Sequence, residues 1–303
     1  MRFDRGQFTA SAVSYLLMRK GSVAQLAIPR IDTSRMRLLV WPREHGAWGI
    51  IGISLLTGTA VGLTHKSQAA ALLLFAIAVV AVFCARHPLE ILLGMAPLHA
   101  RTDAERRRVT VAFVAFAGAA LLAFAGLFWR GQNSGLLVLG AVCGMLFLVQ
   151  NQLRRRGRQG RMTAQMVGAL GLTATAAGAY YVATGQLNAT TAALWMANWI
   201  FAGNQIHFVQ LRIRGARLEN RRQKFSAGRG FFAGQCIMML ALGTAAWQGI
   251  LPGAAVAAFV PVLARGLVWF LRRPQPLCVQ RLGLTELAHA VIFGVLLIAS
   301  YRM

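Results

Sequence analysis

Nine apolar stretches, each close to the length of a membrane-spanning helix, dominate this sequence from Gly46 onward. A helix that crosses the hydrocarbon core of a bilayer needs about 20 mainly apolar residues. The stretches are 46–64, 67–86, 109–129, 135–152, 162–183, 190–210, 230–247, 252–271 and 283–300. Composition agrees: 57% of the 303 residues are hydrophobic and only 13% are charged, whereas soluble domains carry about 25% charged residues. The sequence predicts an all-α membrane protein with nine transmembrane helices.

Basic residues alternate between the two sides of these predicted helices. The chain holds 32 Lys and Arg against 8 Asp and Glu, a net charge of +24. One set of connections contains Arg86, Arg101–Arg108, Arg154–Arg161, Arg212–Arg229 and Arg272–Arg281, while the other set contains Lys66 and Arg130, with Arg302 at the C-terminus. Because cytoplasmic loops are enriched in Lys and Arg, we expect a cytoplasmic N-terminus and an external C-terminus. This charge indicates contact with anionic lipid headgroups rather than with nucleic acid.

Residues 1–40 differ from the rest of the chain, since they contain no apolar stretch long enough for a signal-peptide core. We interpret them as a poorly ordered basic tail or at most a short surface helix, with Met36 as an alternative start of translation. The polytopic membrane domain then covers 41–303.

A first polar motif, Pro42-Arg43-Glu44-His45-Gly46-Ala47-Trp48, opens the first predicted helix. Proline before a helix and glutamate in its first turn also occur in an ordinary helix start. Adjacent Glu44 and His45 at this depth exceed what a cap requires, so both are candidate functional residues.

A second motif, Arg86-His87-Pro88-Leu89-Glu90, ends the second predicted helix. Pro88 predicts a break in the helix, because proline lacks the backbone N–H and clashes with the preceding turn. If a helix restarts there, His87 and Glu90 share one face, since they are three residues apart. A solvated helix end is the alternative interpretation.

The third motif runs from Asn204 to Arg214 at the cytoplasmic end of the sixth predicted helix. Polar groups within a membrane helix are costly unless they face water or each other. Asn204 and His207 are therefore candidate site residues. The candidate anion-binding residues here are Gln210, Arg212 and Arg214.

The last two predicted helices each carry an ionisable group. Glu286 and His289 are spaced as in one helix of a carboxylate-bridged di-iron protein. Arg265 lies inside the eighth predicted helix, about 9 Å from its end at 1.5 Å per residue. An arginine at this depth needs a charged partner or a water-filled cavity, so we expect Arg265 to pair with Glu286 or Glu44.

All these residues fall at the predicted cytoplasmic face, where they would line one polar cavity. Arginine is suited to carboxylate and phosphate, which makes Arg86 and Arg265 further candidates for anion binding. Histidine and glutamate are also suitable ligands for a divalent metal. The candidate metal ligands are His87, Glu90, His207, Glu286 and His289.

The motif PREHGAW resembles the start of the YwiC-like family of integral membrane proteins, and the arginine of VLARG and the glutamate of LGLTE fit that family's later polar positions. The resemblance covers about residues 40–303 and implies a multi-pass protein of the bacterial inner (cytoplasmic) membrane, without an established activity. A looser likeness is to the UbiA superfamily of intramembrane prenyltransferases, which implies a nine-helix bundle with polar motifs after helices two and six. Those enzymes hold magnesium and a prenyl diphosphate with aspartate-rich motifs, and RHPLE and NQIHFVQLRIR contain no aspartate.

We therefore expect a cytoplasm-facing cavity that binds an amphipathic or isoprenoid-like ligand, with UbiA-like transferase chemistry as one hypothesis. One alternative is a transporter of small solutes, although the predicted outer half has almost no polar residues for alternating access. Another is a non-catalytic assembly factor for a respiratory or haem complex, which would dock through its basic loops.

Overall fold

The structure is a computed structural model that describes residues 33–42, 44–63, 69–96, 98–131, 134–157, 160–216, 218, 220–272 and 277–303. By its internal contacts the chain divides into one unit that ends at Leu38 and another that covers Leu39–Met303. Of the predicted tail, residues 1–32 lie outside the described part, and Thr33–Val40 form the helix α2.

The second unit is built entirely from helices, and no strand occurs among the described residues. Its helices are α3 (His45–Gly62), α4 (Ala69–Leu92), α5 (Asp103–Trp129), α6 (Ser134–Arg155), α7 (Arg161–Thr184), α8 (Ala189–Gly215), α9 (Arg221–Trp247), the 3₁₀ helix η1 (Gly253–Phe259), α10 (Val260–Leu271) and α11 (Val279–Ser300).

Each of the nine predicted segments contains a helix, and η1 and α10 together make the eighth. Seven of the described helical segments are long and apolar enough to cross a membrane: 69–92, 103–129, 134–155, 161–184, 222–247, 253–271 and 279–300. The apolar part of α3, Gly46–Gly62, is shorter. α8 is not among the seven, since Asn198, Asn204 and Gln205 interrupt its apolar sequence. The chain is thus a multi-pass membrane protein, and the count of nine crossings stays a prediction.

The two long cytoplasmic loops expected at 87–108 and 211–229 are much shorter in the structure. α4 continues to Leu92 and α5 begins at Asp103, while α8 continues to Gly215 and α9 begins at Arg221. Arginine and glutamine are good helix formers, so the helices extend beyond their apolar parts into these basic segments. Side-chain caps define the starts: Thr102 accepts from the N–H of Glu105, and Asn220 from that of Gln223.

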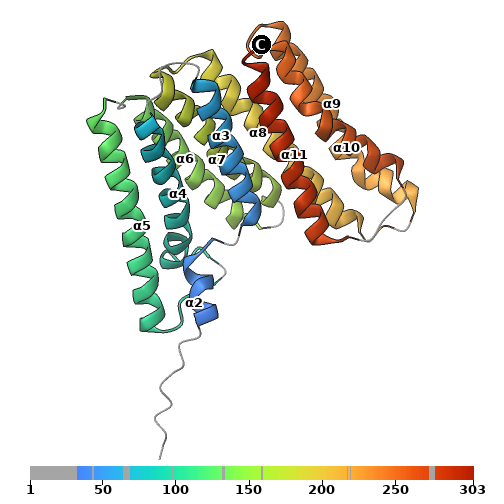
Figure 1. Ribbon diagram of the computed structural model, residues 1–303. Coiled ribbons are helices and arrows are strands. Elements are labelled where there is room, and N and C mark those ends of the chain that lie inside the picture. The colour runs from blue at the N-terminus through green and yellow to red at the C-terminus, as the bar shows by residue number, and fades with distance from the viewer. Residues whose placement is uncertain are drawn as a thin grey trace, which may run out of the picture. The chain divides into compact units, whose positions relative to one another are not determined.

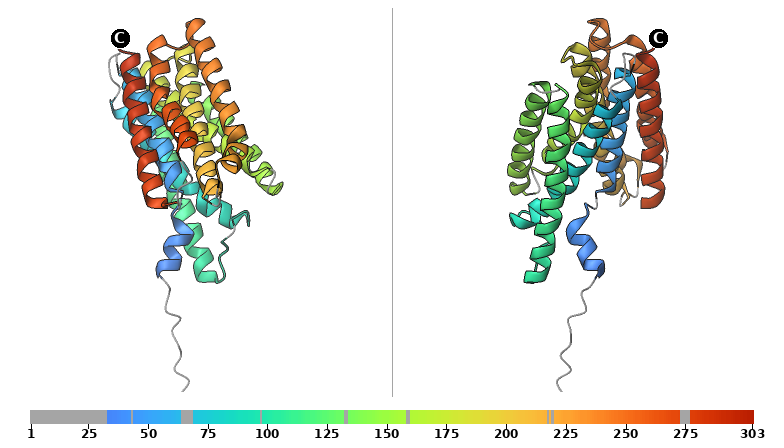
Figure 2. Two further views of the ribbon diagram at one scale, coloured as in Figure 1. Left: turned by 90° about the vertical axis from the view of Figure 1, so that its right-hand side faces the viewer. Right: turned by 60° about the vertical axis from the view of Figure 1, so that its left-hand side comes forward.

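Successive helices of this unit run in opposite directions, so that the ends of α4, α6 and α8 lie on the same side as the starts of α3, α5 and α11 (Figure 1). α7 is the most buried candidate span, with 61% of its most apolar stretch inside the protein, against 17% for α5 and 11% for α6. α7 therefore forms the centre of its half of the bundle. α5 and α6 lie at the edge, as the right-hand view of Figure 2 shows.

Small residues allow α7 to approach its neighbours closely. A Cβ atom added at Gly58 of α3 would lie 2.1 Å from the carbonyl oxygen of Ala176, and one at Gly178 would lie 2.3 Å from the ring of Phe75. Lipid provides no hydrophobic force between helices, so close van der Waals packing has to stabilise the bundle. The Gly- and Ala-rich sequence of α7 makes this close packing possible.

A second apolar core joins α8 and α9 to η1, α10 and α11. The rings of Phe201 and Phe293 stack with centroids 4.0 Å apart, and Phe259 packs edge-on against Phe293 at 5.2 Å. This core fixes α10 against α11, which positions the polar residues described next.

Candidate functional site

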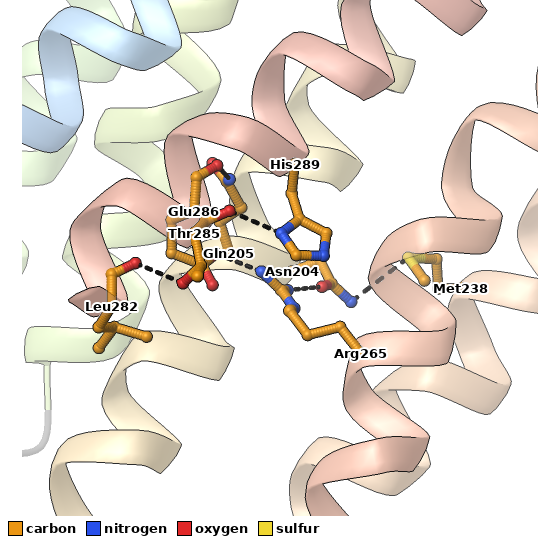
Figure 3. A network of polar contacts seen from close by, with 8 residues as sticks. All are labelled: Asn204, Gln205, Met238, Arg265, Leu282, Thr285, Glu286 and His289. Atoms are coloured by element: carbon orange, nitrogen blue, oxygen red, sulfur yellow. Dashed lines mark hydrogen bonds and ion pairs between the residues drawn. The ribbon is translucent and has the colours of Figure 1, made fainter. Parts of the chain in front are cut away.

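Arg265 of α10 and Glu286 of α11 form a buried ion pair (Figure 3). The Nη1 atom of Arg265 donates to Oε2 of Glu286, and the side chains are only 9% and 11% exposed. The predicted pairing of Arg265 with Glu286 is confirmed. The alternative partner, Glu44, lies in a different group of residues. Because both charges are withdrawn from water, loss of either partner would leave the other uncompensated.

α8 supplies the remaining partners of this pair. Nη2 of Arg265 donates to Oδ1 of Asn204 over 2.9 Å, and Nδ2 of Asn204 contacts the sulfur of Met238 on α9 at 3.7 Å. The guanidinium carbon of Arg265 also lies 4.0 Å from the centre of the Phe208 ring, a cation–π contact. The cost of the polar Asn204 in α8 is thus offset by a contact with a buried charge.

Two atoms of this network have no hydrogen-bond partner among the described residues: Nε of Arg265 and Oε1 of Glu286. Gln205 contacts the backbone of α11 instead, since its Nε2 donates to the carbonyl of Glu286 over 2.8 Å. Nδ1 of His289 lies 2.6 Å from the carbonyl oxygen of Thr285, one turn earlier in α11. His289 is thus engaged with its own helix.

A second ionic group lies where α3 begins and α4 and α6 end. Oε1 of Glu90 accepts from Nε of Arg86 over 2.9 Å and from Nη1 of Arg154 over 3.2 Å. Glu44 joins at its edge, with 3.8 Å between its carboxylate and Nη2 of Arg154. Glu90 is 10% exposed and Arg86 is 15% exposed, whereas Glu44 is 55% exposed. We call these four residues, Arg86, Glu90, Arg154 and Glu44, the Glu90 group. Its buried members are Arg86 and Glu90.

The predicted break at Pro88 is wrong, because α4 runs without interruption from Ala69 to Leu92. Proline removes one hydrogen bond of a helix, but neighbouring helices tolerate such a loss in membrane proteins, and Pro88 is buried against them. The continuous helix places Arg86 and Glu90 four residues apart on one face. Glu90 therefore faces Arg86.

A cavity of about 630 Å³ lies between α3, α4, α5, α6 and α7. Its wall is almost wholly apolar, and it includes exposed residues such as Leu121 and Gly140, so the cavity opens at the surface of the bundle. Four residues of the wall have polar side chains: Arg86, Cys143, Gln150 and Thr175. The residues of this wall form no motif in the sequence, because the cavity is created by the packing of five helices.

Two of those four polar side chains are hydrogen-bonded to backbone carbonyls. The hydroxyl of Thr175 donates to the carbonyl of Leu172 over 2.8 Å, and the thiol of Cys143 donates to the carbonyl of Gly171 over 3.8 Å. Arg86 and Gln150 remain, and both lie towards the ends of their helices, where the Glu90 group is found. One end of an apolar cavity thus carries a guanidinium and an amide.

The other candidate residues lie elsewhere. Gln210 donates to Gln165 of α7 over 3.5 Å, and Arg212 and Arg214 belong to the last turn of α8. His207 packs edge-on against the ring of Phe231, with centroids 5.3 Å apart. His45 is the first residue of α3, but its side chain lies outside the described part of the structure.

Ion pairs between described residues join some of the candidates into two groups, one around Glu90 and one around Glu286. The structure therefore does not bring the candidates together in the single polar cavity that we expect from the sequence. In the described part of the chain, no three His, Cys, Asp or Glu side chains are close enough to hold a metal ion. A metal site built from His87, Glu90, His207, Glu286 and His289 gains no support from this arrangement.

Two further residues lie beside the predicted candidates, Arg154 in the Glu90 group and Gln150 in the cavity wall. The sequence does not distinguish Arg154, because several arginines surround it. Gln150 lies in the last apolar segment of α6, and its burial at 6% is the signal that distinguishes it. Three successive amides, Gln150, Asn151 and Gln152, precede the basic helix end, and the sequence alone does not show which of them is buried or against which helix.

Residues 41–183 match the family model described as YwiC-like protein. Comparisons with the curated proteins and with the solved structures gave no match. The whole wall of the cavity, from Ile51 to Gly178, lies inside the matched segment. The Glu90 group lies there too, whereas Arg265 and Glu286 lie outside it.

Proposed function

We propose that this multi-pass membrane protein, whose residues 41–183 match the YwiC-like family model, binds an amphipathic, isoprenoid-like ligand in the cavity between α3 and α7. The observation that carries the proposal is the wall of this cavity, which is apolar except at one end. A volume of about 630 Å³ lies within the range of about 300–1,000 Å³ typical of small-molecule sites.

The length of the cavity supports a chain-like ligand. Its wall follows α4 from Phe75 to Leu89 and α6 from Leu136 to Gln150. Each stretch spans fourteen residue steps, which is about 21 Å at 1.5 Å per residue. This is about two thirds of the hydrocarbon core of a bilayer, so an extended apolar chain fits along the helices. The opening near Leu121 and Gly140 gives such a chain a route from the surrounding lipid.

The proposal includes a position in the membrane. With the N-terminus in the cytoplasm, nine crossings would place Arg86, Arg154 and Arg214 on the cytoplasmic side of the bacterial inner membrane, in agreement with the positive-inside rule. The polar end of the cavity then faces the cytoplasm. Anionic headgroups of the inner leaflet would contact the same basic helix ends.

The proposed function is binding. Transfer chemistry of the UbiA kind needs aspartates to hold magnesium, and Asp103 is the only aspartate after residue 32. Asp103 lies in the first turn of α5, beside the N-cap Thr102, and takes no part in the Glu90 group.

Purification in native lipid, followed by native mass spectrometry, tests this proposal. We expect a stoichiometric amphipathic molecule bound to the wild-type protein. Gly140 and Gly144 of α6 line the cavity, and an added Cβ at either meets no atom within 4 Å, so Gly140→Leu with Gly144→Leu fills the cavity without a clash at the backbone.

The double variant should lose the bound molecule while it keeps its thermal stability. Gly243→Leu is a matched control, since Gly243 is exposed on α9, has no neighbour within 4 Å of an added Cβ and does not line the cavity. Retention of the molecule by the filled variant would contradict the proposal. So would a wild-type protein that carries a stoichiometric partner protein and no bound lipid, which is the result expected of an assembly factor.

A further inference from the structure

We propose that the ligand of this cavity carries an oxygen anion, a carboxylate or a phosphate, at the head of its chain, and that Arg86 binds this group. The inference rests on the proposed function, because it names the chemical class of the ligand. It is carried by the hydrogen bonds, the burial and the charge of the residues at the polar end of the cavity.

Arg86 has a free donor at this end. Its Nε is bonded to Glu90 over 2.9 Å, but its Nη2 is buried and has no hydrogen-bond partner among the described residues. A buried donor without an acceptor is destabilising, because it has lost its hydrogen bonds to water. Because Arg86 lines the cavity, an oxygen atom of a bound ligand can accept this bond.

The local charge favours an anion over a neutral group. Arg86 and Arg154 share the single carboxylate of Glu90, which leaves these three groups with a net charge of +1. Glu44 lies 3.8 Å from Arg154 and is more than half exposed, so water screens it from the cavity. One negative charge on the ligand would complete the neutralisation of the buried group.

Neighbouring side chains hold the site in shape. The guanidinium carbon of Arg86 lies 5.8 Å from the centre of the Phe147 ring, and Glu90 fixes its other edge. Gln150 lies beside Gly168 of α7, where an added Cβ would come within 2.2 Å of the amide nitrogen. Gln150 is buried in the cavity wall and can provide a second donor for the same oxygen anion.

The length of the apolar wall favours a chain-bearing anion over free phosphate as the ligand. Below the polar end, the wall offers a ligand only apolar contacts and the two backbone-bonded side chains of Cys143 and Thr175. A free anion would leave this surface unfilled.

The experiment compares ligands with one chain and different head groups. Tritiated oleyl phosphate is the labelled ligand for the full-length protein in detergent, and oleic acid, oleyl alcohol and inorganic phosphate are compared as competitors. We expect oleyl phosphate and oleic acid to bind roughly ten- to a hundred-fold more tightly than oleyl alcohol, since bonds to charged groups contribute about 1.5–3 kcal/mol. Inorganic phosphate should not displace the label at the same concentrations.

Arg86→Gln should reduce this preference for the anion to about one, while the affinity for oleyl alcohol is retained. Glu90 keeps Arg154 as a partner in this variant, which protects the fold. Arg155→Gln is the control, because Arg155 is exposed at the end of α6, next to Arg154, and does not line the cavity. It should keep the full preference.

The outcomes separate this inference from the proposed function. Equal binding of oleyl alcohol and oleic acid by the wild-type protein would overturn the anion site and leave the chain-binding cavity intact. Displacement by inorganic phosphate as strong as that by oleyl phosphate would overturn the chain-bearing ligand. Failure of all three oleyl compounds to bind would contradict the proposed function itself. The wild-type comparison decides the matter even if Arg86→Gln does not fold.

Discussion

Arg265 and Glu286, 21 positions apart in the sequence, join α10 to α11 through a buried ion pair, with Asn204 of α8 as a third member. The polar contacts among these three helices therefore depend on one guanidinium. Since an arginine is costly inside a membrane, the pair explains why Arg265 is tolerated in an otherwise apolar helix.

Removing one member of this pair should strand the other. Arg265→Ala and Glu286→Ala are each expected to destabilise the protein by roughly 3–5 kcal/mol, by analogy with buried pairs in soluble proteins. The double variant should cost less than the sum of the two, because it leaves no uncompensated charge. Thermal unfolding in detergent measures all three variants.

Arg281→Ala is the control for this cycle, because Arg281 is exposed on α11, and its midpoint should match that of the wild type. Additive effects of the two single changes, or single variants with unchanged midpoints, would show that the pair contributes no coupling.

Arg265→Lys tests the shape of the group rather than its charge. Lysine keeps the positive charge but lacks the planar fork with which Arg265 contacts both Glu286 and Asn204. We expect a stability between those of the wild type and of Arg265→Ala. Asn204→Ala should then cost much less in the lysine background than in the wild type. An equal cost of Asn204→Ala in both backgrounds would mean that Asn204 acts independently of Arg265.

Gly58 should accept no larger residue. A Cβ atom there would lie 2.1 Å from the backbone oxygen of Ala176, so Gly58→Ala has to separate α3 from α7. Overpacking typically costs about 1–3 kcal/mol, and a backbone clash falls at the upper end. Gly52→Ala on the same helix is the matched control, since its Cβ meets no atom within 4 Å. Equal thermal midpoints for the two variants would contradict the close contact of α3 and α7.

The sequence alone predicted the helical class, the nine helical segments and the Arg265–Glu286 pair. Apolar length identifies a membrane helix, and a charge within it demands a partner, so these features follow from single segments. The continuous helix through Pro88 could not be predicted from the sequence, because a proline inside a helix is tolerated only when neighbouring helices pack around it. The cavity could not be predicted either, since apolar periodicity does not reveal which helices pair or where their packing leaves space.

The topology gives a prediction of its own. Nine crossings with the N-terminus in the cytoplasm place Met303 outside and the basic 211–229 segment inside. Fusions of alkaline phosphatase and of green fluorescent protein after Met303 distinguish the two sides, since the phosphatase is active only outside and the fluorescent protein folds in the cytoplasm. We expect an active phosphatase and a dark fluorescent fusion. A fluorescent fusion with inactive phosphatase would exclude an odd number of crossings with this orientation.

Cryo-electron microscopy of the protein in native-lipid nanodiscs shows whether the cavity between α3 and α7 holds an amphipathic ligand with its head at Arg86. We expect elongated density that follows α6 from Leu136 to Phe147 and ends in a larger feature within hydrogen-bond distance of Nη2 of Arg86. A cavity without such density, or density whose head group lies at the Leu136 end, would mean that the ligand does not bind in this way.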